Sequence, residues 1–357
     1  MDRIHIGLIG AGIIGATHSA VLRTIANVMP DQVELTAVAD PSPQARELFV
    51  TLYRYRHAFV DARDLLQRGD VDTVFVCTPT AFHADLVRGA AAAGKQLFCE
   101  KPLAMSLDEA RDMSDAVRRA GIKSQIGLVL RFSALYTVMR DLLFSADAGD
   151  PMAVVFRDDQ VFPIRGMHDS AWRKDRSLTA GGTLIEHGVH DLDLLTWFFG
   201  PIARLRAWQQ NRAGHPGVED YMAVELEFAS GLRAQLVNLW HDMIQRPSNR
   251  RLEIFCQRGF FASDHDMVGD LLVQLGDGAE QRLDPRAVLD RFTALLARPD
   301  IHFSDWYGIP YLLQDLAFIE ALLADRDPVP SLDVGVEAQR IADAVYRAAA
   351  SGEEVEV

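Results

Sequence analysis

The stretch that decides the fold is Ile4–Gly15, IHIGLIGAGIIG, near the start of the sequence. A short apolar run ends in three glycines with the spacing GxGxxG, and residues 16–26 then have the pattern of a helix. In such a strand, loop and helix, Gly10 permits the tight turn, Gly12 lets the backbone approach a pyrophosphate, and Gly15 lets the helix pack on the strand. Because the helix N-terminus offers free amides to phosphate, the pattern predicts dinucleotide binding at Gly10, Gly12, Ile13, Ile14 and Gly15.

A second apolar run, residues 33–39, ends at Asp40, close to where the dinucleotide fingerprint expects an acidic residue. A carboxylate at this position accepts hydrogen bonds from the ribose hydroxyls and repels a 2′-phosphate. No arginine follows Asp40 directly, because residues 41–43 are Pro-Ser-Pro and begin the next predicted helix. We therefore expect NAD as the cofactor and disfavour NADP.

Apolar runs and helical patterns continue to alternate after Asp40. The pattern predicts strands at 73–77, 96–99 and 123–128, and helices at 61–67, 81–93 and 107–120. Such alternation is typical of a doubly wound parallel sheet, in which ligands bind beyond the carboxyl ends of the strands. Residues 1–128 are therefore predicted to form a dinucleotide-binding Rossmann domain.

Two of these strand ends are followed by residues whose side chains can bind a ligand or take part in catalysis. The first is followed by Thr78, Pro79 and His83, and the second by Glu100, Lys101 and Pro102. Pro102 disfavours helical dihedrals at Lys101 and so holds it extended at the strand tip. A lysine is usually only solvated, but at a ligand-facing strand end a functional role is favoured. Cofactor contacts are therefore expected from Thr78, Pro79, His83, Glu100 and Lys101.

Composition excludes several classes of function. The formal net charge is −14 and the basic residues are scattered, which argues against nucleic acid and against an anionic membrane surface as partners. Cys77, Cys99 and Cys256 have no metal or redox spacing and lie in apolar runs, so reduced, buried thiols are expected. Without a leader-like or membrane-spanning run, the protein is expected to be cytoplasmic.

Ionisable residues interrupt the apolar helical pattern of residues 181–200, GGTLIEHGVHDLDLLTWFFG. The pattern predicts a helix over 183–199, with Thr183 as its cap and Glu186 as the capping-box acid. Glu186, His190 and Asp193 then lie along one stripe and need partners, of which a ligand is one. The alternatives are a cap, a satisfied core histidine and a carboxylate bound to a backbone amide.

A metal site built from Glu186, His187, His190 and Asp191 is disfavoured, because all four residues come from one helix. The HExxH and CxxC patterns typical of many metal sites are also missing from the sequence. We therefore expect no metal ion in this protein.

From about residue 130 the rhythm of the sequence changes. The pattern predicts a helix at 133–145, a strand at 152–157, an irregular polar segment to Lys174, strands at 204–210, 221–228, 233–240 and 251–256, and closing helices at 305–323 and 334–350. Apolar residues at 222, 224, 226 and 228 alternate with Glu225 and Glu227, as in an antiparallel sheet with one covered face. Residues 129–357 are therefore predicted to form an α/β domain for substrate binding and oligomerisation.

The segments GAGIIG, VAD, CTPTAFH, CEKPLA and GGTLIEHGVHDLD together resemble the Gfo/Idh/MocA family of NAD(P)-dependent oxidoreductases, which includes inositol and sugar dehydrogenases. The resemblance extends over almost the whole chain. It implies a Rossmann domain followed by an α/β domain with a large, open, mostly antiparallel sheet, and a site between the two. It also implies that Lys101 contacts the nicotinamide ribose and the substrate, and that His190 is the acid/base.

Two positions depart from the pattern of the family. Glu186 stands where inositol dehydrogenase-like members more often have aspartate, and Thr80 stands where asparagine is common. Because some members carry the same EH…HD form, we expect the first departure to bear on the identity of the substrate more than on activity.

These features predict an enzyme that moves hydride between NAD and a secondary alcohol carbon of a sugar, cyclitol or related polyol. His190 is expected to remove the hydroxyl proton, Lys101 to stabilise the developing negative charge, and Glu186 to orient the hydroxyl or the imidazole. Arg131 is expected to matter most for a substrate that bears a carboxylate. The candidate substrate contacts are Arg131, Asp159, Trp172, Arg173, Glu186, His187, His190 and Tyr307.

Two other classes of function remain open at this point. One is a glycosidase or lyase that oxidises and re-reduces a sugar carbon with tightly held NAD. The other is a non-catalytic sensor of sugar or NAD, which would not need Lys101 and His190 together. A broad sheet needs both faces accounted for, so we also expect a homodimer or homotetramer formed through the polar face of the carboxyl-terminal sheet.

Overall fold

A computed structural model describes residues 2–145, 147–165, 170–298 and 309–357. The chain divides into two compact units. The first unit contains residues 1–128, 177–180 and 311–339, and the second contains residues 129–176, 181–310 and 340–357. The division into two contiguous domains, 1–128 and 129–357, stays a prediction. Among the described residues, no helix has the length and apolar character needed to cross a membrane.

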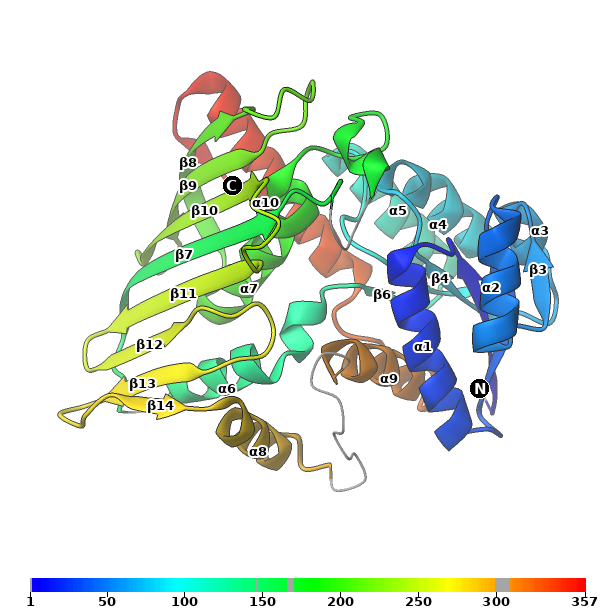
Figure 1. Cartoon of the computed structure of the whole chain (residues 1–357), viewed down its shortest axis with the longest axis horizontal. Helices are drawn as coiled ribbons and strands as arrows, with labels where there is room; N and C mark the ends of the chain where they lie inside the picture. The colour runs from blue at the N-terminus through cyan, green and yellow to red at the C-terminus, as the bar shows by residue number, and fades with distance from the viewer. Residues whose placement is uncertain (1, 146, 166–169, 299–308) are drawn as a thin grey trace. The chain divides into compact units, whose positions relative to one another are not determined.

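The first unit is built on a six-stranded parallel sheet in the order β3-β2-β1-β4-β5-β6 (Figure 1). Its strands are β1 (Ile4–Ile9), β2 (Val33–Ala39), β3 (His57–Phe59), β4 (Thr73–Val76), β5 (Gln96–Cys99) and β6 (Ser124–Ile126). The helices between them are α1 (Ile13–Val28), α2 (Pro43–Tyr53), α3 (Ala62–Leu66), α4 (His83–Ala92) and α5 (Leu107–Ala120), with a short 3-10 turn at Thr80–Phe82. The predicted doubly wound parallel sheet is confirmed.

Both faces of this sheet are covered by apolar layers. Val74 and Val76 of β4 pack in one cluster with α4 and α5, whereas Phe75 packs in another with α1 and with α9 (Ile309–Leu323). Neighbouring side chains of one strand therefore enter different cores, as expected of a parallel strand buried on both sides. Cys77 and Cys99 are buried as predicted, whereas Cys256 is partly exposed.

The glycine loop is held by close backbone approaches. Gly10 has a φ of +99°, and a Cβ there would lie 2.5 Å from the carbonyl oxygen of Cys77. A Cβ on Gly15 would lie 2.1 Å from the carbonyl oxygen of Gly10. Larger residues cannot fit at either position without displacing the backbone, so the glycine spacing is a packing requirement of β1, α1 and the end of β4.

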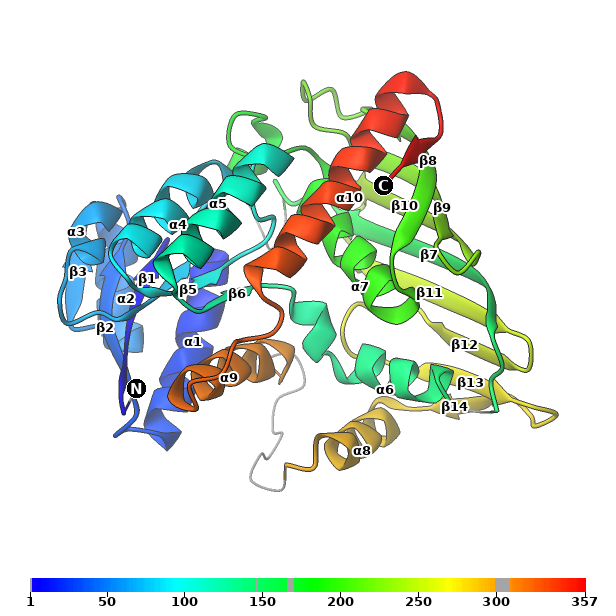
Figure 2. The same ribbon diagram turned by 180° about the vertical axis from the view of Figure 1, so that it is seen from behind.

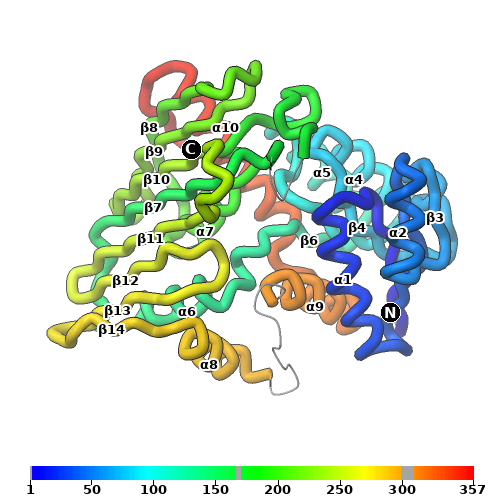
Figure 3. Tube along the Cα trace, viewed as in Figure 1, coloured from blue at the N-terminus to red at the C-terminus, as the bar shows by residue number. Residues whose placement is uncertain are grey.

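The second unit is built on a nine-stranded sheet in the order β14-β13-β12-β11-β7-β10-β9-β8-β15, whose trace is shown in Figure 3. Its strands are β7 (Pro151–Val161), β8 (Ile202–Gln210), β9 (Tyr221–Phe228), β10 (Arg233–His241), β11 (Asn249–Cys256), β12 (Gly259–Ser263), β13 (Leu271–Leu275), β14 (Gln281–Leu283) and β15 (Val355–Glu356). All neighbours pair antiparallel except β7 and β10, which are parallel. The predicted mostly antiparallel sheet is confirmed.

Helices α6 (Ala134–Leu143) and α7 (Val189–Phe199) lie against one face of this sheet (Figures 1 and 2). The residues of β9 alternate as predicted, with Met222, Val224, Leu226 and Phe228 buried and Glu225 exposed. The Phe199 and Phe228 rings, 5.6 Å apart between centroids, join α7 to β9. The alternation therefore identifies the face that the helices cover.

The sequence pattern missed several elements of the second unit. Strands β12 to β15 and helix α8 (Pro285–Leu296) were not predicted, and β7 extends four residues beyond the predicted end at Arg157. The extension contains Asp158, Asp159 and Gln160, which look like loop residues but are buried. Closing helices α9 and α10 (Leu332–Ser351) are confirmed over their described residues.

A buried polar cluster lies in the core of the first unit. The His18 imidazole of α1 lies between two carboxylates, with Nδ1 2.9 Å from Asp315 of α9 and Nε2 3.0 Å from Glu100. Burial alone would lower the pKa of His18, but the two carboxylates more than offset it and raise the pKa to about 10. At neutral pH, His18 is therefore an imidazolium that donates to both carboxylates.

This cluster predicts an alkaline loss of stability. The folded-state pKa of His18 lies above the unfolded value. The contribution of His18 to the free energy of unfolding is therefore fully present below about pH 6.5 and is lost as the pH rises through about 10. The double variant His18→Gln/Asp315→Asn keeps the net charge of the cluster but has no titrating ring. Thermal unfolding of both proteins between pH 6 and pH 11 should show the wild-type advantage shrinking with rising pH, and a constant difference would contradict the charged imidazole.

Candidate functional site

The glycine loop has the features that a dinucleotide needs. Helix α1 begins at Ile13, and its N-cap, Gly12, provides no side-chain cap for the first-turn amides. Apart from Gly12 and its neighbours in the chain, no heavy atom of the described residues lies within 4 Å of a Cβ built on Gly12, and Ile13 is 52% exposed. The first-turn amides and the backbone of Gly12 are therefore open to an anion such as a pyrophosphate.

Asp40 lies beside this loop at the end of β2. Its Oδ2 accepts from the amide of Ala11 at 2.8 Å, and its Oδ1 accepts from the amide of Ser42 at 2.8 Å. Each oxygen keeps further lone pairs, so the carboxylate can still accept from a ribose hydroxyl. Arg46 of α2 donates to the backbone oxygen of Asp40 at 2.6 Å.

His83 joins the two loops that follow β4 and β5. Its Nε2 lies 2.9 Å from the carbonyl oxygen of Thr78, and its Nδ1 lies 3.0 Å from that of Pro102. The ring is buried, which lowers the pKa of His83. Its polar contacts are thus with the backbone of the loops that contain Thr78, Pro79 and Lys101, and a direct cofactor contact from His83 stays a prediction.

Glu100 is a buried partner of Lys101. One of its carboxylate oxygens faces His18, and Oε2 accepts from the backbone amide of Lys101 at 3.1 Å. A Cβ on Gly127 would lie 2.5 Å from Oε1, so the absence of a side chain there makes room for the carboxylate. Glu100 therefore fixes the backbone of Lys101, while its predicted cofactor contact is untested.

In the second unit, the segment predicted as one helix begins with a π-helical turn, Leu184–Gly188, before α7. The capping prediction was wrong, because Thr183 makes no side-chain cap. Glu219, which precedes β9, accepts instead from the amides of Gly182 at 2.7 Å and Leu184 at 3.0 Å. Burial raises the pKa of Glu219, and these amide hydrogen bonds oppose the increase.

Two carboxylates within the α7 segment itself, Glu186 and Asp193, are bound by arginines. Glu186 is buried and lies 3.0 Å from Nε of Arg173, whose guanidinium stacks over Trp172 at 4.6 Å. Arg131 donates to both oxygens of Asp193, at 2.8 and 2.7 Å. Three candidate substrate residues therefore lie in two ion pairs, Glu186 with Arg173 and Arg131 with Asp193, and a fourth, Trp172, stacks on Arg173.

His187 has a partner on the sheet, and Asp159 has one in the loop between β10 and β11. Nδ1 of His187 accepts from Nε1 of Trp240 at 2.8 Å. Asp159 lies 2.8 Å from Nε of Arg246 and, by the alternation of β7, points away from the face that Asp158 enters. His190 is buried in the first turn of α7, and Tyr307 lies outside the described residues.

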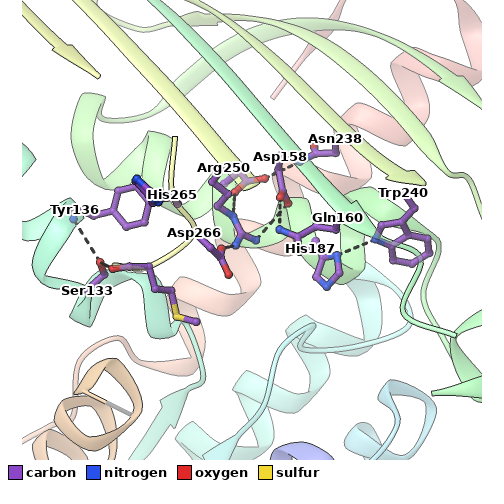
Figure 4. A network of polar contacts seen from close by, with 12 residues as sticks. Ser133, Tyr136, Asp158, Gln160, His187, Asn238, Trp240, Arg250, His265 and Asp266 are labelled. Carbon is purple, nitrogen blue, oxygen red and sulfur yellow. Dashed lines mark hydrogen bonds and ion pairs between the residues drawn. The ribbon is translucent and has the colours of Figure 1, made fainter. Parts of the chain in front are cut away.

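Figure 4 shows a largely buried network that was not predicted, in which Arg250 of β11 contacts Asp158 and Asp266. Arg250 also bonds Asp191 of α7, as does Asn238 of β10. The sequence of β10 contains one indication of this network, since Asn238 occupies an inward position between the buried Leu236 and Trp240. A polar residue there needs a partner within the protein.

Both parts of the chain match models of one protein family. Residues 4–128 match the oxidoreductase family with an NAD-binding Rossmann fold, and residues 136–262 match the Gfo/Idh/MocA carboxyl-terminal domain. Together the two matches cover well over half of the sequence.

Similar whole proteins support the same assignment. The chain is 26% identical to the uncharacterized oxidoreductase YrbE of Bacillus subtilis, over 98% of this chain and 96% of that protein. It is also 26% identical to an inositol 2-dehydrogenase of Rhizobium meliloti, over 99% of both chains. The crystal structure of an oxidoreductase domain protein from Kribbella flavida aligns over 100% of both chains with a TM-score of 0.84 and 26% identity. The chain therefore belongs to the Gfo/Idh/MocA family of oxidoreductases and has its NAD-binding Rossmann fold.

Proposed function

We propose that this protein is an NAD-dependent dehydrogenase that oxidises a secondary alcohol of an uncharged sugar, cyclitol or related polyol. The observation that carries the proposal is the buried His190, which lies in one helical segment with Glu186 and Asp193, the carboxylates that Arg173 and Arg131 bind. The inositol dehydrogenase similar over nearly the whole chain supports the substrate class.

The pairing of charges favours an uncharged substrate. Arg131, the residue best suited to a substrate carboxylate, donates two hydrogen bonds to Asp193. Burial raises the pKa of Asp193 and Arg131 opposes this increase. The charge of Arg131 is therefore balanced within the protein, which weakens its attraction for a substrate carboxylate. The charge of Glu186 is likewise balanced by Arg173. These paired side chains therefore suit the hydroxyl groups of a substrate, which are uncharged hydrogen-bond donors and acceptors.

The proposed roles follow from the chemistry of each side chain. The nicotinamide supplies the acceptor for the hydride. His190 accepts the proton of the substrate hydroxyl, since a neutral imidazole is a general base at neutral pH. Lys101, whose backbone is held by Glu100, donates a hydrogen bond to the same oxygen and stabilises its developing negative charge. Glu186, fixed by Arg173, orients the hydroxyl or the imidazole.

We also propose a homodimer or homotetramer formed through the face of the nine-stranded sheet that no described helix covers (Figure 1). This face carries exposed apolar residues on β7, β8 and β11, namely Val155, Trp208 and Phe255. Burying them against a second copy would remove apolar surface from water. The expected cytoplasmic location stays a prediction.

A substrate screen tests the proposed activity. Purified protein with NAD should produce NADH absorbance with members of a panel of neutral sugars and inositols, and much less with the matching sugar acids. A preference for the acids would contradict the assignment of Arg131. Cleavage of a glycoside without release of NADH would instead identify the redox-neutral glycosidase or lyase.

Two substitutions test the division of roles. His190→Ala should leave NAD affinity nearly unchanged and lower turnover by about 10²–10⁴, the usual contribution of a positioned base. The variant should also lose the acidic limb of the pH–rate profile, because only a neutral imidazole accepts a proton. Lys101→Ala should lower turnover and weaken NAD binding, and Lys101→Arg should recover little, since a planar fork does not replace a compact ammonium. Normal turnover and an unchanged pH profile in His190→Ala would refute the role of the helix.

Light scattering tests the oligomer. The wild-type protein at micromolar concentration should have the mass of a dimer or tetramer, and Phe255→Glu should shift the mass towards the monomer by placing a charge in the interface. A monomeric wild-type protein would reject the proposed assembly.

A further inference from the structure

Asp191 follows His190 in α7 but is bound to the sheet by both of its oxygens. Oδ1 accepts from Nε of Arg250 at 2.8 Å, and Oδ2 accepts from Nδ2 of Asn238 at 2.6 Å. Asp191, Asn238 and Arg250 are all buried. The contacts join one position of the helix to two different strands, β10 and β11, which restricts both the rotation and the sliding of α7.

The arginine that holds Asp191 is itself held in place. Its NH2 lies 3.3 Å from Asp158 of β7, and its NH1 contacts Asp266 (Figure 4). Gln160 donates to the other oxygen of Asp158 at 2.5 Å. Burial, partly offset by Arg250, raises the pKa of Asp158 to about 7, as expected where three carboxylates share one guanidinium. Arg250 is thus fixed from two sides and presents a constant donor to Asp191.

The backbone of the same turn lies directly on β10. A Cβ on Gly188 would lie 2.5 Å from Oδ1 of Asn238, so the helix approaches this asparagine as closely as a glycine allows. Asn238 therefore contacts the turn before His190 by packing and the residue after it by a hydrogen bond. A shift of α7 in either direction would break one of these contacts.

We propose that Asp191, held by Asn238 and Arg250, is the positioning residue that fixes the orientation of His190 for proton transfer. The inference rests on the proposed role of His190. A buried ion pair of this kind is a poor source of net stability, because desolvation offsets most of the attraction, whereas it can specify one geometry. A base must lie within hydrogen-bond reach of its proton, so a small rotation of the helix lowers turnover.

The central variant is Asp191→Asn, which keeps the shape of the side chain and removes its charge. We expect turnover to fall by about tenfold to a hundredfold, with KM and the NAD dissociation constant changed by less than about threefold. The exchange Asp191→Asn/Asn238→Asp restores one amide and one carboxylate across the same contact and should recover most of the turnover. A milder variant, Asn238→Ala, removes one neutral donor and should have an intermediate effect.

A double-mutant cycle separates positioning from general damage. If Asp191 acts through His190, Asp191→Asn should lower turnover in the wild-type background but not further in the His190→Ala background. The matched control is Asp220→Asn. Asp220 is also a buried carboxylate of the second unit, but it accepts from the amides of Arg212 and Ala213 and should tolerate the change within about twofold.

The outcomes distinguish the two levels of the hypothesis. An equal loss in both backgrounds, or an exchange variant no better than Asp191→Asn, would overturn the positioning role while leaving His190 as the base. Normal turnover in His190→Ala alone would overturn the proposed role of His190 as the base, whereas the absence of NADH formation with every neutral sugar and inositol of the panel would overturn the proposed function. If Asp191→Asn does not fold, the Asn238→Ala variant measured in both His190 backgrounds decides the question in the same way.

Discussion

The second unit depends on how closely the start of the α7 segment approaches the sheet. A Cβ on Gly182 would lie 1.8 Å from the backbone oxygen of Glu219, and a Cβ on Gly188 would lie 2.5 Å from the side-chain oxygen of Asn238. No larger residue fits at either position, so the absence of two side chains sets the depth of the helix. Once that depth is set, the Glu219 carboxylate can reach the amides of the turn, and Asp191 can reach two strands.

Local features of the fold could be predicted from the sequence because they leave a local pattern. The glycine loop, the strands of the first unit other than β3, and the alternation in β9 each follow from neighbouring residues. Features that depend on distant partners could not be predicted. The cap of the α7 segment comes from Glu219, which lies 37 positions after Gly182. The buried Asp158 in the extension of β7 is paired with Arg250, which lies 92 positions further along the chain.

The same limit applies to the candidate site. Arg131, Arg173 and Glu186 were predicted to contact the substrate because the sequence does not show which charged residues pair in the fold. Arg131 and Asp193 are 62 positions apart, yet they form a bidentate ion pair. The charges in this part of the second unit are therefore largely matched within the protein, and the remaining selectivity has to come from hydroxyl hydrogen bonding and shape.

The two buried thiols of the first unit can be used to measure local opening of its sheet. Cys77 and Cys99 lie at the ends of β4 and β5, and burial raises the pKa of both well above the ordinary thiol value. Alkylating reagents attack the thiolate, so neither residue can react until the strand ends open to solvent. The partly exposed Cys256 of the second unit provides an internal reference in the same chain. The labelling rates of Cys77 and Cys99, each divided by that of Cys256, therefore report how often the ends of β4 and β5 open to solvent. Because Gly10 packs on the backbone of Cys77, the rate at Cys77 also reports on the opening of the glycine loop.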